Sequence, residues 1–162
     1  KVASTHFLQM LHRTEIFPAV ILRLFLTYGP GQNSDRFLPQ IIHACMNDDI
    51  FPTSAGEQLR DFCFVTDTVN AIVKALLLEN IEGQIFNIGS GIPISINEVT
   101  TKVEQIIGKG NPLHGAIPYR VGENMFLYPE IENAKIKLNW SPEVNLEEGL
   151  RITIKWYSEC KI

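Results

Sequence analysis

The chain has 162 residues, of which 45% are apolar and 20% are charged, and its formal net charge is −4. That length suits one domain with its own hydrophobic core, and the near-average composition excludes an intrinsically disordered chain. No apolar run approaches the roughly 18 residues of a membrane helix, and the mild acidity argues against a nucleic-acid-binding face, which needs clustered basic residues.

The first half of the chain predicts alternating helices, strands and loops. Apolar residues recur at helical spacing over 2–13, and a run rich in β-branched residues over 18–26 predicts a buried parallel strand. Glycine and proline alternate over 28–34, which indicates a loop. Residues 37–47 follow as a second helix, with Pro39 tolerated in its first turn.

The middle of the chain predicts two further strands around one helix. The first strand ends over 62–65, and Thr66 or Asp67 is the predicted N-cap of a helix that reaches about Glu79. Residues 84–88 form the second buried strand, which a glycine-rich turn ends.

The last third of the chain predicts three helices. Ser95, with Glu98 three positions on, forms the capping box of a helix over 96–107. A short helix over 130–138 leads through a turn to a closing helix over 146–157.

Helices that alternate with strands predict an α/β domain. Two buried strands are few for an independent parallel sheet, and helical sequence begins directly at Lys1, so we expect this chain to be part of a longer protein. The three cysteines lie far apart and form no CxxC pair, which predicts reduced thiols in a cytoplasmic protein and no metal site: Cys45, Cys63 and Cys160.

Two arginines are the strongest candidates for chemistry. Arg60 stands at the entry to a strand and Arg120 stands in a loop. A guanidinium group grips phosphate oxygens in a bidentate manner, so two that converge on one cleft would clamp a diphosphate. The alternative is that each is a surface arginine paired with a neighbouring acid, such as Asp61 beside Arg60.

Five segments occur in an order and spacing that resemble a known family: PAVILRLFLTYGPGQ, GEQLRDFCFVTDTVNAI, QIFNIGSG, PYRVGEN and LNWSPEVNLEEGLRITIKWY. Together they resemble the C-terminal half of the extended short-chain dehydrogenases/reductases, and most closely the NAD-dependent nucleotide-sugar epimerases and 4,6-dehydratases. The resemblance implies the C-terminal part of a Rossmann-type doubly wound sheet, about 1–30 and 62–91, plus the small substrate-binding domain, about 31–61 and 92–162. The N-terminal NAD-binding half of the family has no counterpart in this sequence.

The resemblance assigns roles to single residues. Lys1 matches the family's catalytic lysine, which binds the nicotinamide ribose and lowers the pKa of a tyrosine four positions upstream; that tyrosine is the base that deprotonates the sugar while hydride passes to NAD. The backbone of Leu24 matches a position that faces the nicotinamide.

Seven positions match substrate-binding positions of the family: Leu26, Arg36, Phe37, Thr53, Arg60, Asn87 and Arg120. Three of the matched motifs depart from the family pattern. Leu26 stands where many members carry an asparagine that binds the substrate, and Glu123 stands where aspartate is usual. Asn139 stands where the family has the glycine of a leucine-glycine-tryptophan turn, and asparagine can take the left-handed conformation that glycine supplies there. Arg60 and Arg120 are implied to hold the diphosphate of a nucleotide sugar.

These matches imply the substrate-binding portion of a nucleotide-sugar epimerase or dehydratase, inactive alone. NAD would be the cofactor of the parent enzyme and would not be bound by this chain. The alternatives are a non-catalytic nucleotide-binding or scaffold module, which Leu26 favours slightly, and an α/β fragment whose ligand site never forms. We also expect an exposed apolar surface near 18–26 and 2–13, and a homodimer through helix 2–13.

Overall fold

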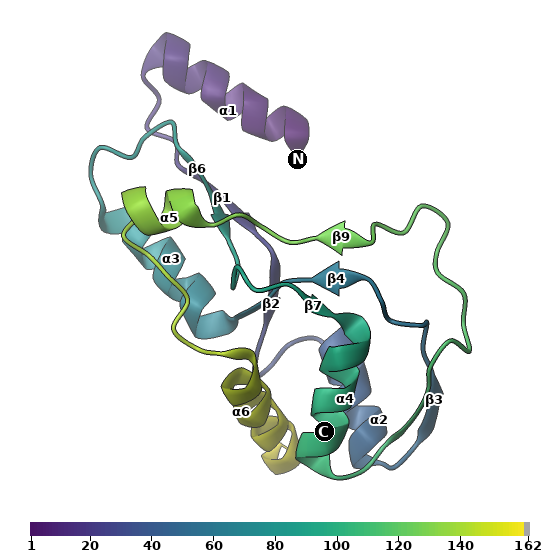
Figure 1. The fold of residues 1–162 in the computed structure, drawn as a ribbon. Helices are drawn as coiled ribbons and strands as arrows, with labels where there is room; N and C mark the ends of the chain where they lie inside the picture. The colour runs from purple at the N-terminus through teal and green to yellow at the C-terminus, as the bar shows by residue number, and fades with distance from the viewer. Residues whose placement is uncertain (161–162) are drawn as a thin grey trace.

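The computed structural model describes residues 1–160 and shows an α/β fold (Figure 1). Two pairs of parallel strands lie at its centre: β1 (Ile21–Leu24) pairs with β6 (Ile85–Ile88), and β2 (Leu26–Tyr28) pairs with β5 (Phe62–Phe64). The α/β class with parallel strands is therefore confirmed.

The single strand predicted over 18–26 is two strands, because the chain changes partner at Phe25, from β6 to β5. The prediction that this strand is buried is wrong at its C-terminal end, where Leu24 is 49% and Leu26 is 45% exposed. Among the described residues, β1 pairs with β6 alone, so its other edge is open.

Shorter strands form two further sheets: β3 (Ile50–Pro52) with β8 (Asn111–Leu113), and β4 (Leu59–Arg60) between β7 (Ile94–Ser95) and β9 (Phe126–Leu127). Only Asp61 separates β4 from β5 along the chain. The three-stranded sheet and the β2–β5 pair therefore meet at this residue.

Two apolar cores hold these elements. The larger one lies where the rings of Tyr28 and Phe64 pack against three helices. Those helices are α2 (Phe37–Met46), α4 (Ile96–Ile107) and α6 (Leu146–Glu159). In the smaller one, Phe86 of β6 packs with Trp140 and with residues of α3 (Val65–Leu77) and α5 (Glu132–Lys137).

The capping box predicted for α4 is confirmed. The Ser95 hydroxyl accepts from the Glu98 amide at 3.1 Å, and the Ser95 amide donates to the Glu98 carboxylate at 3.0 Å. Gly108 ends the helix at φ 75°, in the left-handed region that glycine favours. Local sequence therefore fixes both ends of this helix.

The cap predicted for α3 is wrong. Phe64 precedes the helix, and no side chain of the described residues caps it. Asp67 lies inside the first turn and is buried; its carboxylate accepts from the Val144 amide at 3.1 Å, and its carbonyl accepts from the Trp140 indole at 3.0 Å. A tertiary contact has taken the carboxylate that a local cap would use.

Helix α1 (Val2–Glu15) is the helix predicted over 2–13, and it stands apart from the body of the fold (Figure 1). Every residue of α1 is at least partly exposed, including Val2 at 74% and Phe7 at 56%. The expected exposed apolar surface is therefore confirmed. Within residues 1–160, no helix has the length and hydropathy needed to cross a membrane.

Candidate functional site

Arg60 is far more enclosed than the other arginines predicted to bind substrate. It ends β4, which strands hold on both edges, and its side chain is 12% exposed. Its Nη1 donates to the carbonyl of Leu59 at 2.8 Å, and its Nη2 donates to the carboxylate of Glu123, which is 21% exposed. The alternative in which Arg60 pairs with its neighbour Asp61 is therefore wrong.

The segment that carries Arg120 is attached to β4, which carries Arg60, and to the residues just before that strand. At one end, the Tyr119 hydroxyl accepts from the Glu57 amide at 3.0 Å and donates to the Glu57 carboxylate at 3.2 Å. At the other end, Glu123 contacts Arg60, and its amide donates to the Arg120 carbonyl at 3.0 Å. Arg120 is exposed between these two attachments. The two arginines thus belong to adjacent segments, and their convergence on one ligand stays a prediction.

Asp61 anchors the turn that follows β6. It is fully buried and accepts from the Ser90 amide at 2.6 Å, the Ser90 hydroxyl at 2.9 Å and the Gly91 amide at 2.7 Å. Burial raises the pKa of Asp61, and these hydrogen bonds oppose that shift. A Cβ at Gly89 would lie 2.7 Å from Asp61 Oδ1, so only glycine lets the turn approach this closely.

Three of the predicted substrate-binding residues line one hollow of about 420 Å³: Leu26, Arg36 and Phe37. Its walls come from β2, from the loop before α2, from the first residues of α2 and from Phe62 of β5. Polar and apolar groups line it in about equal measure, and its volume is within the range of small-molecule sites. Leu26 supplies a methyl surface here, where the resemblance leads one to expect an amide.

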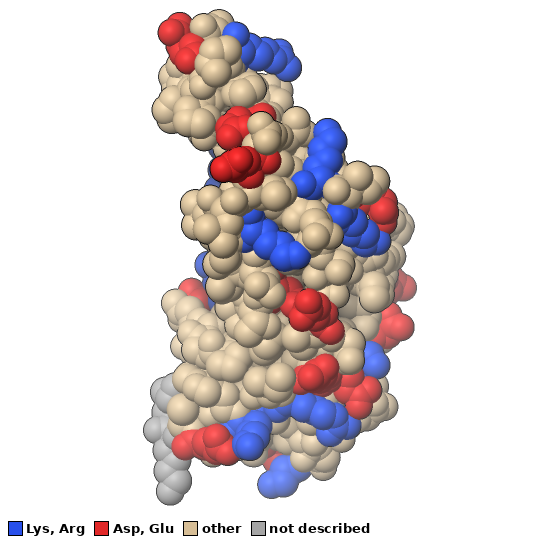
Figure 2. Space-filling model, turned by 90° about the vertical axis from the view of Figure 1, so that its left-hand side faces the viewer, with Lys and Arg blue, Asp and Glu red and all other residues tan. Residues whose placement is uncertain are grey.

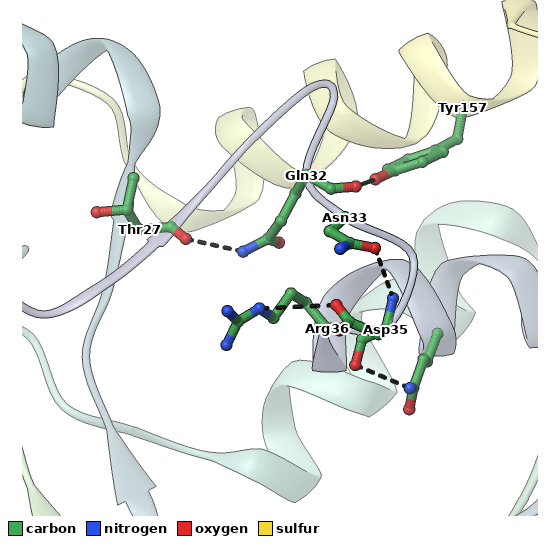
Figure 3. Close-up of polar contacts among 7 residues, drawn as sticks. Thr27, Gln32, Asn33, Asp35, Arg36 and Tyr157 are labelled. Atoms are coloured by element: carbon green, nitrogen blue, oxygen red, sulfur yellow. Dashed lines mark hydrogen bonds and ion pairs between the residues drawn. The ribbon is translucent and has the colours of Figure 1, made fainter.

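The loop that carries Arg36 into this hollow is pinned at its middle (Figure 3). The side-chain amide of Gln32 donates to the Thr27 backbone carbonyl at 3.0 Å, and the Tyr157 hydroxyl of α6 donates to the backbone carbonyl of Gln32 at 2.6 Å. Arg36 itself is 71% exposed, with Asp35 at 3.7 Å. The loop is therefore held from both sides, while the guanidinium group of Arg36 stays open to solvent.

The other four predicted substrate-binding residues do not line that hollow: Arg60, Arg120, Thr53 and Asn87. Thr53 follows β3, is nearly buried, and its hydroxyl lies 3.2 Å from His114 Nδ1. Asn87 lies on β6, and its side-chain amide donates to the Glu130 backbone carbonyl at 3.0 Å. Their contacts hold neighbouring segments together, and their part in ligand binding stays a prediction.

The two residues assigned to the cofactor are both exposed. Lys1 is exposed, and its carbonyl accepts from the Thr5 amide at the start of α1. The Ile21 and Phe25 amides donate to β6, so alternation along the strand turns the backbone of Leu24 to the opposite, open edge. Leu24 therefore has free backbone groups where the resemblance places the nicotinamide.

Neither the surface charge nor the potential metal ligands indicate a second site among the described residues. On the face shown in Figure 2, basic and acidic side chains are interspersed. Among residues 1–160, no cluster of three or more His, Cys, Asp or Glu side chains is arranged to hold a metal ion.

Sequence reasoning missed three residues that shape this site. Glu123 was noted only as a departure from a pattern, Asp61 only as a neighbour of Arg60, and Gln32 was not singled out. Glu123 and Asp61 make contacts 63 and 29 positions away. Asp61 and Gln32 both lie in segments that match the family, and this match was the only indication of their importance. It identifies the residues but not the partners that they contact.

Comparisons with known proteins identify the family of this chain. A family model described as the NAD dependent epimerase/dehydratase family matches residues 1–89. The dTDP-glucose 4,6-dehydratase of Haemophilus influenzae is 29% identical over 97% of this chain and 50% of its own length, and the human dTDP-D-glucose 4,6-dehydratase is 31% identical over 98% and 47%.

A solved structure of UDP-glucose 4-epimerase from Thermotoga maritima, with UDP-glucose, superimposes with a TM-score of 0.89 at 27% identity; it covers 98% of this chain and 52% of that one. The chain spans about half the length of the curated relatives it matches. Such structural neighbours are Rossmann-type proteins, so the fold type implied by the resemblance is confirmed.

Proposed function

We propose, since the chain belongs to the NAD-dependent epimerase/dehydratase family, that it is the substrate-binding C-terminal portion of a nucleotide-sugar epimerase or 4,6-dehydratase, inactive alone. The NAD-binding half of the whole protein would lie outside these 162 residues. On this division, about 1–30 and 62–91 belong to the doubly wound sheet, and about 31–61 and 92–162 bind the substrate.

One observation carries the proposal: the guanidinium group of Arg60 is almost enclosed, and the segment of Arg120 is attached beside it. The guanidinium group of Arg60 already holds one anion, the carboxylate of Glu123, so this position is suited to bind anionic oxygens. A diphosphate offers such oxygens to two arginines at once. Structural neighbours bind nucleotide sugars, UDP-glucose in the Thermotoga maritima epimerase. We therefore assign the diphosphate to Arg60 and Arg120.

The rest of the ligand would extend from the diphosphate into the neighbouring hollow. Leu26, Arg36 and Phe37 line that hollow, with the solvent-exposed guanidinium of Arg36 free to meet a polar group. Thr53 and Asn87 are proposed as outer contacts, on the nucleobase and sugar sides respectively.

NAD would supply hydride chemistry in the whole protein. The described residues fit only its nicotinamide end, through Lys1 and the open backbone edge at Leu24. A dinucleotide pyrophosphate needs a glycine-rich turn that opens directly into a helix. Here β2 leads into a loop and β6 leads into β7. These residues do not form a complete NAD site, so we derive no catalytic step from them.

The proposal includes a homodimer through α1 and a cytoplasmic location. Support for the first is the apolar surface that α1 exposes, and support for the second is that all three cysteines are free thiols: Cys45, Cys63 and Cys160.

A second candidate is a non-catalytic nucleotide-binding or scaffold module. Leu26 favours it, because this side chain lines the hollow and leucine offers a substrate no hydrogen bond. The two candidates share the diphosphate site and differ in whether an NAD-binding half completes it.

Binding of UDP, dTDP and NAD to the 162-residue chain, measured by calorimetry and thermal shift, tests the proposal. We expect UDP or dTDP to bind and raise the unfolding temperature, and NAD to leave it unchanged. R60A and R120A should each weaken nucleotide binding about tenfold or more, whereas R151A, which removes an exposed arginine of α6 paired with Glu147, should not. Equal binding by R60A and the unaltered chain would refute the assignment.

A further inference from the structure

The carboxylate of Glu123 occupies the guanidinium group that the proposed ligand needs. We propose that Glu123 is an internal competitor of the ligand diphosphate, which holds Arg60 until phosphate oxygens displace it. This inference rests on the proposed function and adds a residue that sets the affinity and selectivity of the same site.

The burial of the pair makes the competition strong. The Arg60 and Glu123 side chains are only 12% and 21% exposed, so their charges interact with little screening by water. The Leu59 carbonyl already takes one donor of the guanidinium group, and Glu123 takes another. A phosphate at the same donors would lie against a carboxylate of like charge. The two anions therefore exclude each other.

The turn that carries Glu123 is exposed to solvent, so it can move when the carboxylate leaves Arg60. Arg120, Val121 and Gly122 precede Glu123, and Arg120 and Val121 are exposed. Gly122 has φ 76°, and the Glu123 amide donates to the Arg120 carbonyl, so the four residues form one tight turn. Release of the carboxylate would move this turn as a unit and would free Arg120 to reach the same anion.

The segment that moves on release of Glu123 is fixed at its N-terminal end. The Tyr119 hydroxyl stays bonded to Glu57 on the strand side, which limits the motion to the residues after it. The site would thus change from an internal Arg60–Glu123 pair to a ligand held by Arg60 and Arg120. A ligand with two phosphates gains most from this exchange, because it replaces one carboxylate with several oxygens.

The test compares three variants by calorimetry at constant ionic strength, with inorganic pyrophosphate and UDP as probes. E123Q removes the competing charge. E123D keeps the charge but shortens its reach by one methylene. E57Q removes a carboxylate from the same strand–loop attachment but leaves an acceptor for Tyr119, and so controls for the general effect of net charge.

We expect E123Q to bind pyrophosphate about tenfold more tightly than the unaltered chain, E123D to bind it several-fold more tightly, and E57Q to change less than twofold. Tighter binding by E123D, whose net charge is unchanged, separates the direct contact from long-range electrostatics. Pyrophosphate carries no ribose, so a loss seen with UDP alone would report a separate contact of Glu123 to the sugar.

The outcomes separate the two proposals. If UDP binding depends on Arg60 but E123Q and E123D bind pyrophosphate no more tightly than the unaltered chain, the competitor role is overturned and the proposed function stands. If pyrophosphate binds to E123Q and not to the unaltered chain, the competitor role is supported. If neither probe binds to any of these proteins, both proposals fail. Circular dichroism verifies that each variant is folded. If E123Q does not fold, the comparison of E123D with the unaltered chain decides the question.

Discussion

The carboxylate of Asp61 and the backbone amide of Ser90 are 2.6 Å apart, and this bond joins β5 to the turn after β6. Asp61 stands between Arg60, which ends β4, and Phe62, which begins β5. It therefore fixes the point from which one neighbour enters the proposed diphosphate site and the other lines the adjacent hollow.

D61A should destabilise the fold strongly. It removes a buried acceptor of three hydrogen bonds and leaves the amides of Ser90 and Gly91 without that partner. We expect a loss of about 3 kcal/mol in the free energy of unfolding, measured by urea denaturation. S90A, which removes the hydroxyl and keeps the amide, should cost only about 1 kcal/mol. Similar losses in the two variants would contradict this role for Asp61.

Gly149 in α6 should not tolerate alanine. Alanine in place of glycine ordinarily stabilises a helix by about 1 kcal/mol. Here a Cβ would lie 2.1 Å from the Tyr28 hydroxyl oxygen and 2.9 Å from a ring carbon of Phe64. G149A should therefore lower the free energy of unfolding by about 2 kcal/mol.

The Y28F variant provides the matched control for this contact. It removes the hydroxyl nearest to the added methyl group, so the double variant Y28F/G149A should lose less than the sum of the single losses. Denaturation of all four proteins gives this coupling, and strict additivity would show that the strain lies elsewhere.

The capping box of α4 should give a defined dependence on pH. The hydrogen bond from the Ser95 hydroxyl, followed by that from its amide, lowers the pKa of Glu98. A carboxyl whose pKa is lower in the folded state stabilises the fold above its unfolded pKa of about 4.3 and loses this effect as pH falls through the folded value. S95A should therefore cost about 1 kcal/mol at pH 7 and less at pH 3.

E98Q tests the same contact without a titrating group. Glutamine can also complete a capping box, so the stability of this variant should fall less than that of the unaltered chain between pH 5 and pH 3, a window set by the lowered pKa of Glu98. Denaturation at each pH measures this. If the free energy of unfolding depends on pH identically in the two proteins, Glu98 does not contribute to the pH dependence of stability in this window.

The cysteines should differ in reactivity. Burial raises the pKa of Cys45 and of Cys63 to about 11, while Cys160 near the C-terminus is only half-buried. At pH 8 only about one in a thousand of the buried thiols would be ionised. Iodoacetamide followed by mass spectrometry should label Cys160 first, and the other two only after denaturant is added. Early labelling of Cys63 in the folded protein would contradict its burial.

Local sequence was sufficient where a structure depends on neighbours along the chain. Ser95, Glu98 and Gly108 define α4. Asn139 takes the left-handed conformation, φ 47°, that its match to the glycine of a family turn implies. Local sequence failed where a side chain serves a distant partner, because periodicity carries no information about position in space. Asp67 has the local signature of a cap and instead bonds to Val144.

The candidate site divides in the same way. The matched motifs identified Arg60 and Arg120, and the structure attaches their segments to each other. They did not identify Glu123 as the partner of Arg60, because this pair joins β4 to the turn before β9, and the two segments come together only when β4 pairs with β9. Motif order gives the members of a site, whereas their charge pairing depends on the sheet that brings them together.

The homodimer proposed through α1 gives the last prediction. Phe7 and Met10 are 56% and 47% exposed, and α1 contributes no residue to either apolar core described here. Glutamate at both positions should therefore leave the fold intact but introduce charge into the proposed interface, where its desolvation opposes association. We expect a dimer for the unaltered chain and a monomer for F7E/M10E in analytical ultracentrifugation. I136E, at an exposed apolar position on α5, should remain dimeric; a monomeric unaltered chain at high micromolar concentration would overturn the assignment.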